Sequence, residues 1–184
     1  MEKPGDFRRR TITYVTFLCA VLALLAGCAS PATYEGMIPD RFDITQKRPE
    51  TVDVVVSGGQ ETNAMWKTQI SDEAFKQALI EAIGKSQAFS KVVQGKDANF
   101  LLSVLIFNME QPSFGVSLTV NLEAVWKLSR VDNGKTVWSE SIKSENTAGF
   151  SDAFAAVKRL RIATEGAAQK NIAEGLARIS KLNL

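Results

Sequence analysis

The chain has 184 residues, of which 45% are hydrophobic and 23% are charged, with 22 Lys and Arg against 20 Asp and Glu. This length and apolar share suffice for one domain with its own core, and the near-neutral charge argues against a nucleic-acid-binding surface. The chain has no histidine, the commonest general base and the usual zinc and copper ligand. We therefore expect a protein that is not an enzyme, with no catalytic residue, metal site or cofactor.

The N-terminal segment has the composition of a secretory signal peptide. Arg8–Arg10 form a basic stretch, and the apolar run that follows over residues 11–26 is too short to span a bilayer comfortably. Its end, Leu25-Ala26-Gly27-Cys28, resembles the lipobox of bacterial lipoproteins at all four positions. The alternative is an uncleaved membrane anchor with an incidental cysteine.

The lipobox resemblance implies that residues 1–27 are removed and that Cys28 is acylated, which makes the lipid bilayer a partner. At about 0.8 kcal/mol per buried methylene, two or three acyl chains hold a protein almost permanently. In this family an Asp after the cysteine favours the inner membrane, so Ala29 implies the outer membrane of a Gram-negative bacterium, with the domain facing the periplasm. Cys19 would leave with the leader, and the remaining 18 basic and 18 acidic residues would balance.

Residues 28–50 carry three prolines and one glycine among polar residues, without a helical or strand period. We interpret them as a lipidated, flexible tether with a reach of roughly 25 Å. Three apolar side chains, Tyr34, Ile38 and Phe42, indicate that part of the tether docks on the domain. Residues 51–184 are then a single periplasmic domain.

The first half of this domain predicts alternating strands and one helix. A β-branched run over residues 51–57 before Gly58-Gly59 predicts a buried strand. Ser71 suits a helix N-cap, because acidic residues follow it and apolar residues recur at helical spacing through Ile83. A short strand is predicted over residues 89–93, and the nearly continuous apolar run over 100–107 is typical of a central strand.

The clearest pattern is strict alternation of apolar and polar residues from Val116 to Leu128, which predicts a long strand with one face on a core. Asp132-Asn133-Gly134 would turn it into a hairpin. A two-residue turn would place Leu128 opposite Ser139 and expose Trp138. A three-residue loop with left-handed Gly134 in a bulge would pair Leu128 with Trp138, Ala124 with Ile142, and Glu123 with Lys143. We predict the three-residue loop.

Residues 151–179 predict a long helix with Ser151 as its N-cap and one apolar stripe, formed by Phe154, Val157, Ala168, Ile172, Leu176 and Ile179. The order of elements favours an α+β, two-layer fold. Its sheet would be mainly antiparallel, of about four to five strands, with two helices packed on one face.

Four residues are candidate partner contacts. Trp66 lies outside the periodic elements and either plugs the end of the sheet or anchors a partner, while Phe114 lies near the tip of the loop over residues 109–115. Arg161 and Glu165 interrupt the helical stripe one turn apart, as an ion pair at its edge or as a partner contact.

The lipobox, the strand opening at residues 97–102, the segment over 134–138 after the hairpin and the closing helix together resemble periplasmic lipoproteins with the fold of the TolB amino-terminal domain. These include penicillin-binding-protein activators and auxiliary lipoproteins of ABC-type lipid transporters. The resemblance implies a membrane-anchored, non-enzymatic adaptor of an envelope machine for assembly, transport or peptidoglycan synthesis, with an envelope protein as partner. The alternative is a carrier that holds a lipid or small ligand between the helices and the sheet.

Overall fold

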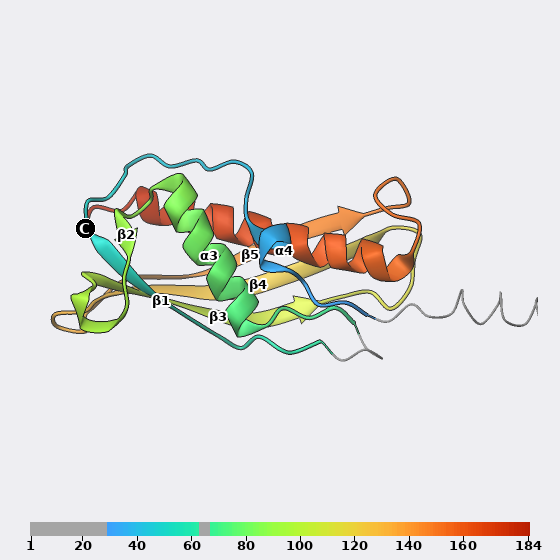
Figure 1. Ribbon diagram of the computed structural model, residues 1–184, viewed down its shortest axis with the longest axis horizontal. Coiled ribbons are helices and arrows are strands. Elements are labelled where there is room, and N and C mark those ends of the chain that lie inside the picture. The colour runs from blue at the N-terminus through green and yellow to red at the C-terminus, as the bar shows by residue number, and fades with distance from the viewer. Residues whose placement is uncertain (1–28, 63–66) are drawn as a thin grey trace, which may run out of the picture.

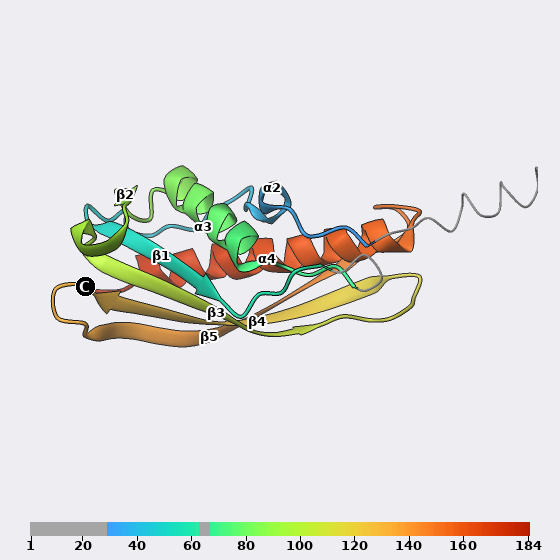
Figure 2. The ribbon, with the colours of Figure 1, turned by 60° about the horizontal axis from the view of Figure 1, so that its bottom comes forward.

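The computed structural model describes residues 29–62 and 67–184, so the leader, Cys28 and Trp66 lie outside the described residues. Five strands form one sheet in the order β2-β1-β3-β4-β5. Figure 1 shows the helices lying across this sheet, and Figure 2 shows that they cover one face and leave the other open. The predicted α+β, two-layer fold is confirmed.

The strands follow the predicted order. They are β1 (Thr51–Ser57), β2 (Lys91–Val92), β3 (Phe100–Glu110), β4 (Leu118–Arg130) and β5 (Thr136–Ala148). β1 runs parallel to β2 and β3, whereas the longer β3-β4 and β4-β5 pairings are antiparallel. The continuous apolar run therefore forms the middle strand of the sheet, as predicted.

Two long helices and one short helix form the other layer. α3 (Asp72–Ser86) begins as predicted, since the Ser71 hydroxyl accepts a hydrogen bond from the backbone N–H of Ala74. α4 (Ala156–Ser180) lies over β4 and β5, and α2 (Tyr34–Met37) is a single turn that the sequence pattern did not predict. A one-turn helix is too short to show a periodicity.

The register of the β4-β5 hairpin is confirmed, but its loop is one residue longer than predicted. Leu128 pairs with Trp138, whereas Ser129 already pairs with Thr136, so Val137 is an extra residue in β5. Arg130 bonds Lys135 across a four-residue loop in which Gly134 has a φ of 68°. The bulge at Val137 offsets the longer loop and returns the indole of Trp138 to the helix-covered face.

The long C-terminal helix begins four residues after the predicted start. Its N-cap is Ala155 and not Ser151, and Phe154, which the periodicity placed on the buried stripe, is 89% exposed. The Asp152 carboxylate accepts a hydrogen bond from the backbone N–H of Gly149, which closes residues 149–152 into a turn before the helix. The later stripe residues, from Ala168 to Ile179, are buried as predicted.

Residues 30–50, expected to be a flexible tether that docks in part, lie along the helical layer (Figure 1). We call this stretch the N-terminal strap. Met37 is fully buried, Gln169 Nε2 donates to the carbonyl of Ile38, and the Arg48 guanidinium donates to the carbonyls of Ile179 and Leu182. The strap contacts the domain well beyond Tyr34, Ile38 and Phe42, the three apolar residues that indicated docking. Polar side chains from α4 form hydrogen bonds with backbone groups of the strap.

A buried polar contact joins α4 to the sheet. The Trp126 indole N–H donates to Asn171 Oδ1 at 2.9 Å, and Asn171 Nδ2 donates to the carbonyl of Ile142 at 2.9 Å. Gly175 lies against the same indole ring, and a Cβ there would be 2.6 Å from it. The glycine thus lets the helix approach the largest buried side chain of the core.

Candidate functional site

Exposed large apolar side chains gather at one end of the molecule, on the β3-β4 and β5-α4 loops. Phe114 and Phe154 are 88% and 89% exposed, and Val116 and Phe150 are also exposed. We call these four residues the aromatic end. Figures 1 and 2 both place the two loops beside the point where the described chain begins.

Arg159 fixes the two loops of the aromatic end to each other. Its guanidinium is buried and donates to the carbonyls of Gly115 at 3.3 Å and Phe154 at 2.6 Å. The same group lies over the Phe150 ring, 4.2 Å from its centroid. The exposed rings are therefore held on a fixed base formed by two loops that are distant in sequence.

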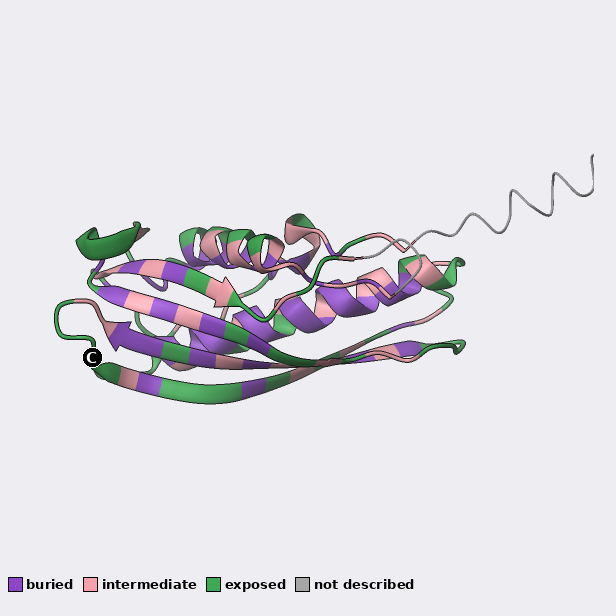
Figure 3. Ribbon diagram, turned by 90° about the horizontal axis from the view of Figure 1, so that it is seen from below, coloured by how far each residue is buried: buried purple, intermediate pink, exposed green. Residues whose placement is uncertain are grey.

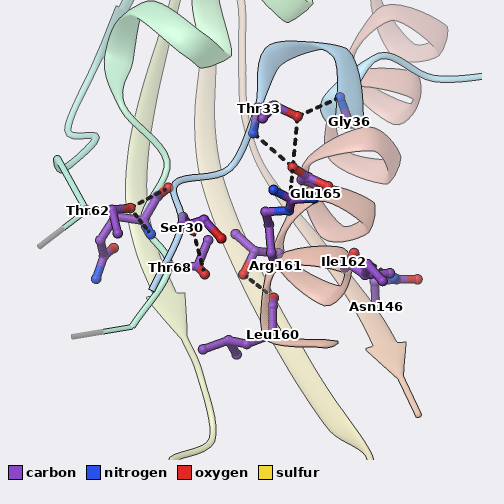
Figure 4. Close-up of polar contacts among 12 residues, drawn as sticks. Ser30, Thr33, Gly36, Thr62, Thr68, Asn146, Leu160, Arg161, Ile162 and Glu165 are labelled. Carbon is purple, nitrogen blue, oxygen red and sulfur yellow. Dashed lines mark hydrogen bonds and ion pairs between the residues drawn. The ribbon is translucent and has the colours of Figure 1, made fainter. Parts of the chain in front are cut away.

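The start of the N-terminal strap is bonded close to this end. The Thr68 hydroxyl donates to the carbonyl of Ser30 at 3.0 Å (Figure 4). Gln111 Nε2 in turn donates to the carbonyl of Thr68 at 2.7 Å and to the hydroxyl of Thr164 at 3.0 Å. Ser30 is thus linked to the base of the loop that carries Phe114 and to the first turns of α4.

Glu165 and Arg161 hold the strap on α4. Glu165 is only 9% exposed, and its Oε1 accepts hydrogen bonds from both the backbone N–H and the hydroxyl of Thr33, each at 2.9 Å (Figure 4). Arg161 Nε lies 3.7 Å from the same oxygen. A Cβ on Gly36 would clash with this carboxyl group, so any side chain there would displace the carboxylate. Arg161 and Glu165 were expected to form an ion pair at the helix edge or to contact a partner. Here they lie close enough to form an ion pair, and Glu165 also binds Thr33 of the strap.

Of the other candidates, Phe114 belongs to the aromatic end, whereas Cys28 and Trp66 lie outside the described residues. The sequence pattern missed Val116, Phe150 and Phe154. Val116 continues the alternation of β4 although the strand begins at Leu118. Gly149, Ser151 and Asp152 around Phe150 favour a turn, and this composition could have indicated that the helix starts later in the sequence.

A second group of exposed apolar residues lies on β1 and β3. Val55 on β1 and Leu105 and Phe107 on β3 are 46%, 41% and 66% exposed. Leu105 pairs with Ser57, two residues from Val55, and Phe107 is the extra residue of a bulge in β3. We call these three residues the outer-face patch. Figure 3 shows the alternation of buried and exposed residues along the strands seen from below.

Two of the hollows at the protein surface have charged side chains on their walls. One of about 420 Å³ lies over β3, β4 and β5 between Glu110, Glu123 and Lys143, and one of about 540 Å³ lies between Asp97 and Arg130. Within residues 29–62 and 67–184, no cluster of acidic side chains could hold a metal ion. No helix of that part of the chain is long and apolar enough to cross a membrane.

One carboxylate has a perturbed pKa. Hydrogen bonds from the Trp138 indole and from Arg178 lower the pKa of Glu140 below its ordinary value of 4.5. Glu140 lies on the helix-covered side of β5, where its pairing partner is the buried Trp126. The Glu140–Arg178 ion pair therefore joins the end of α4 to β5, the outer strand of the sheet. Neither residue lines the hollows described above.

No family model matches the chain, and no curated protein matches it in sequence. Three similar solved structures share its fold. A Xanthomonas campestris protein of the DUF330 family has a TM-score of 0.57 at 9% identity, covering 83% of this chain and 92% of its own. The hypothetical protein CT253 from Chlamydia trachomatis has a TM-score of 0.54 at 9% identity over 72% and 96%. The PelC dodecamer from Paraburkholderia phytofirmans has a TM-score of 0.51 at 15% identity over 79% and 95%. At these identities the likeness shows the fold alone, and membership of the TolB-like lipoproteins stays a prediction.

Proposed function

We propose that the protein is an outer-membrane lipoprotein, anchored through acylated Cys28, that acts as a non-enzymatic adaptor of an envelope machine. The observation that carries the adaptor role is the outer-face patch. Helices close one face of the sheet (Figure 2), while Val55 and Leu105 are exposed on the other face and Phe107 is exposed at the bulge of β3. Exposed apolar side chains that lie together on a sheet favour contact with a protein.

The lipid or small-ligand carrier is the second candidate, and the packing gives it less support. The core between the helices and the sheet is filled by large side chains such as Trp126, Phe75 and Phe100. The hollows of about 420 and 540 Å³ lie at strand surfaces and loop ends, outside this packed core. The carrier expected from the sequence would need a cavity between the helices and the sheet.

In-cell photo-cross-linking tests the adaptor role. A benzoylphenylalanine in place of Phe107 keeps an aromatic ring on the outer-face patch, and the same group in place of Glu81, exposed on α3, is the control. We expect Phe107 to give one discrete cross-linked envelope protein that the Glu81 position does not give. Absence of any protein product at Phe107, together with a lipid that copurifies with the chain, would favour the carrier.

The anchor is tested separately with Cys28→Ser. We expect metabolic labelling with palmitate and a mass shift for the unchanged chain, and neither for the variant, which should be released from the membrane fraction. An Ala29→Asp variant should move the protein to the inner membrane. A wild-type chain that keeps residues 1–27 and takes up no lipid would contradict the anchor.

A further inference from the structure

We propose that the aromatic end lies in the headgroup region of the same bilayer that holds Cys28, so that the domain rests on the membrane surface and does not hang from a flexible tether. This inference rests on the proposed lipid anchor. It adds a second membrane contact, made by Phe114, Val116, Phe150 and Phe154.

Only a short stretch of chain separates the proposed anchor at Cys28 from the folded domain. Ser30 is bonded to Thr68, and Ala32 donates its backbone N–H to the carbonyl of Gln69 at 3.1 Å. A chain spans at most about 3.6 Å per residue, so the Cα of Cys28 lies within about 7 Å of that of Ser30. A lipid on Cys28 therefore holds this end of the domain against the bilayer.

The aromatic end lies close to the start of the N-terminal strap. Gln111, which joins Thr68 to Thr164, is the first residue of the loop that carries Phe114. Arg159, which fixes both loops, lies five residues before Thr164 on α4, about 7.5 Å along the helix at 1.5 Å per residue. The bilayer is consequently the nearest large apolar phase to the exposed rings.

The two loops of the aromatic end carry almost no charge. Residues 111–117 contain no charged residue. The only charge in residues 149–155 is Asp152, whose carboxylate accepts the Gly149 N–H. Lys158 is exposed at the start of α4, where it suits anionic headgroups. Exposed aromatic and aliphatic side chains with a nearby cation are typical of surfaces that insert about 5–10 Å into the headgroup boundary.

Single-cysteine labelling of the lipidated protein tests this orientation. The chain has two cysteines, Cys19 in the leader and Cys28 in its thioether, so an introduced cysteine is the only free thiol. Ser113→Cys places an environment-sensitive fluorophore beside Phe114. Lys135→Cys is the matched control, in the exposed β4-β5 loop at the opposite end of the sheet.

In vesicles of phosphatidylethanolamine and phosphatidylglycerol, we expect the label at position 113 to shift its emission to the blue. Nitroxide-bearing lipids should quench it several-fold more strongly than the label at position 135. In the Ser113→Cys background, Phe114→Ser with Phe154→Ser should abolish the difference, and because both rings are exposed the variant should fold normally. Emission typical of water at both positions would overturn the proposal, as would quenching that survives loss of the two rings.

Two further measurements separate the ways in which the proposal can fail. The mass of the purified protein reports lipidation, so a lipidated chain with a water-exposed label refutes the membrane contact and leaves the anchor intact. An unlipidated chain refutes the anchor on which the inference rests. The soluble Cys28→Ser form is measured without vesicles, and a blue shift that grows with protein concentration would show that a second copy covers the rings, which also overturns the proposal.

Discussion

Replacing Glu165 with alanine should release the N-terminal strap from α4 while the sheet stays folded. The carboxylate accepts two hydrogen bonds from Thr33 and is only 9% exposed. Hydrogen bonds to a charged group contribute about 1.5–3 kcal/mol each, and part of this returns when water reaches the freed groups. We expect the free energy of local opening of the strap to fall by roughly 3 kcal/mol.

Native-state hydrogen exchange is the assay, because it measures local opening separately from global unfolding. The N–H groups of Thr33 and Gly36 should exchange about 100-fold faster in Glu165→Ala, since 1.4 kcal/mol is a factor of ten. Glu165→Gln keeps an acceptor oxygen and should lose only about 1 kcal/mol. Glu174→Ala is the control, because Glu174 lies on the same helix and pairs only with the exposed Arg178.

A double-mutant cycle with Thr33→Val separates the direct contact from general loosening of α4. Residues that share hydrogen bonds should show a coupling energy above about 1 kcal/mol. Unchanged exchange at residues 33–37 in Glu165→Ala would refute the reasoning. It would show that burial of Met37 holds the strap without help from the carboxylate.

Two helix glycines should respond in opposite ways to alanine. A Cβ on Gly84 meets nothing within 4 Å, so Gly84→Ala should raise the free energy of unfolding, measured by denaturant titration, by about 0.5–1 kcal/mol. A Cβ on Gly175 would clash with the Trp126 ring, so Gly175→Ala should lower the free energy of unfolding by about 1–3 kcal/mol. Equal effects of the two substitutions would contradict the packing described for α4. The lowered pKa of Glu140 predicts that its bonds stabilise the fold above pH 4.5 and that this contribution is lost as the pH falls through the folded-state pKa. Thermal melts of Glu140→Gln should therefore lose less stability on acidification than those of the unchanged chain, and parallel curves would contradict the contribution of Arg178 and Trp138.

The sheet was predictable because its strands carry strong local patterns. Strict alternation placed Leu118 to Leu128 on the buried face, and the need to bury Trp138 selected the correct hairpin register. The loop itself was not predictable from that pattern. The backbone N–H of Val131 donates to the carbonyl of Asn99 on the other side of β4, which draws Val131 out of the hairpin ladder and lengthens the loop.

The site was harder to predict because it depends on contacts between distant segments. Phe154 fits a helical stripe by spacing, and only the turn closed by Asp152 removes it from the helix. Arg159 resembles any surface arginine in the sequence, and its role appears only when Gly115 lies beside it. The docked strap likewise depends on Glu165, which is 132 residues from Thr33.

The outer strand of the sheet, β5, has a further consequence for how the protein behaves at high concentration. A free strand edge of 13 residues is a template on which a second chain can add a strand. Here the helix-covered side of β5 carries Glu140, paired with Arg178, and Ser144, whose hydroxyl donates to the carbonyl of Ala167. A chain adding to this edge would have to bury an ion pair, so the same groups that bind α4 to the sheet also oppose aggregation through β5.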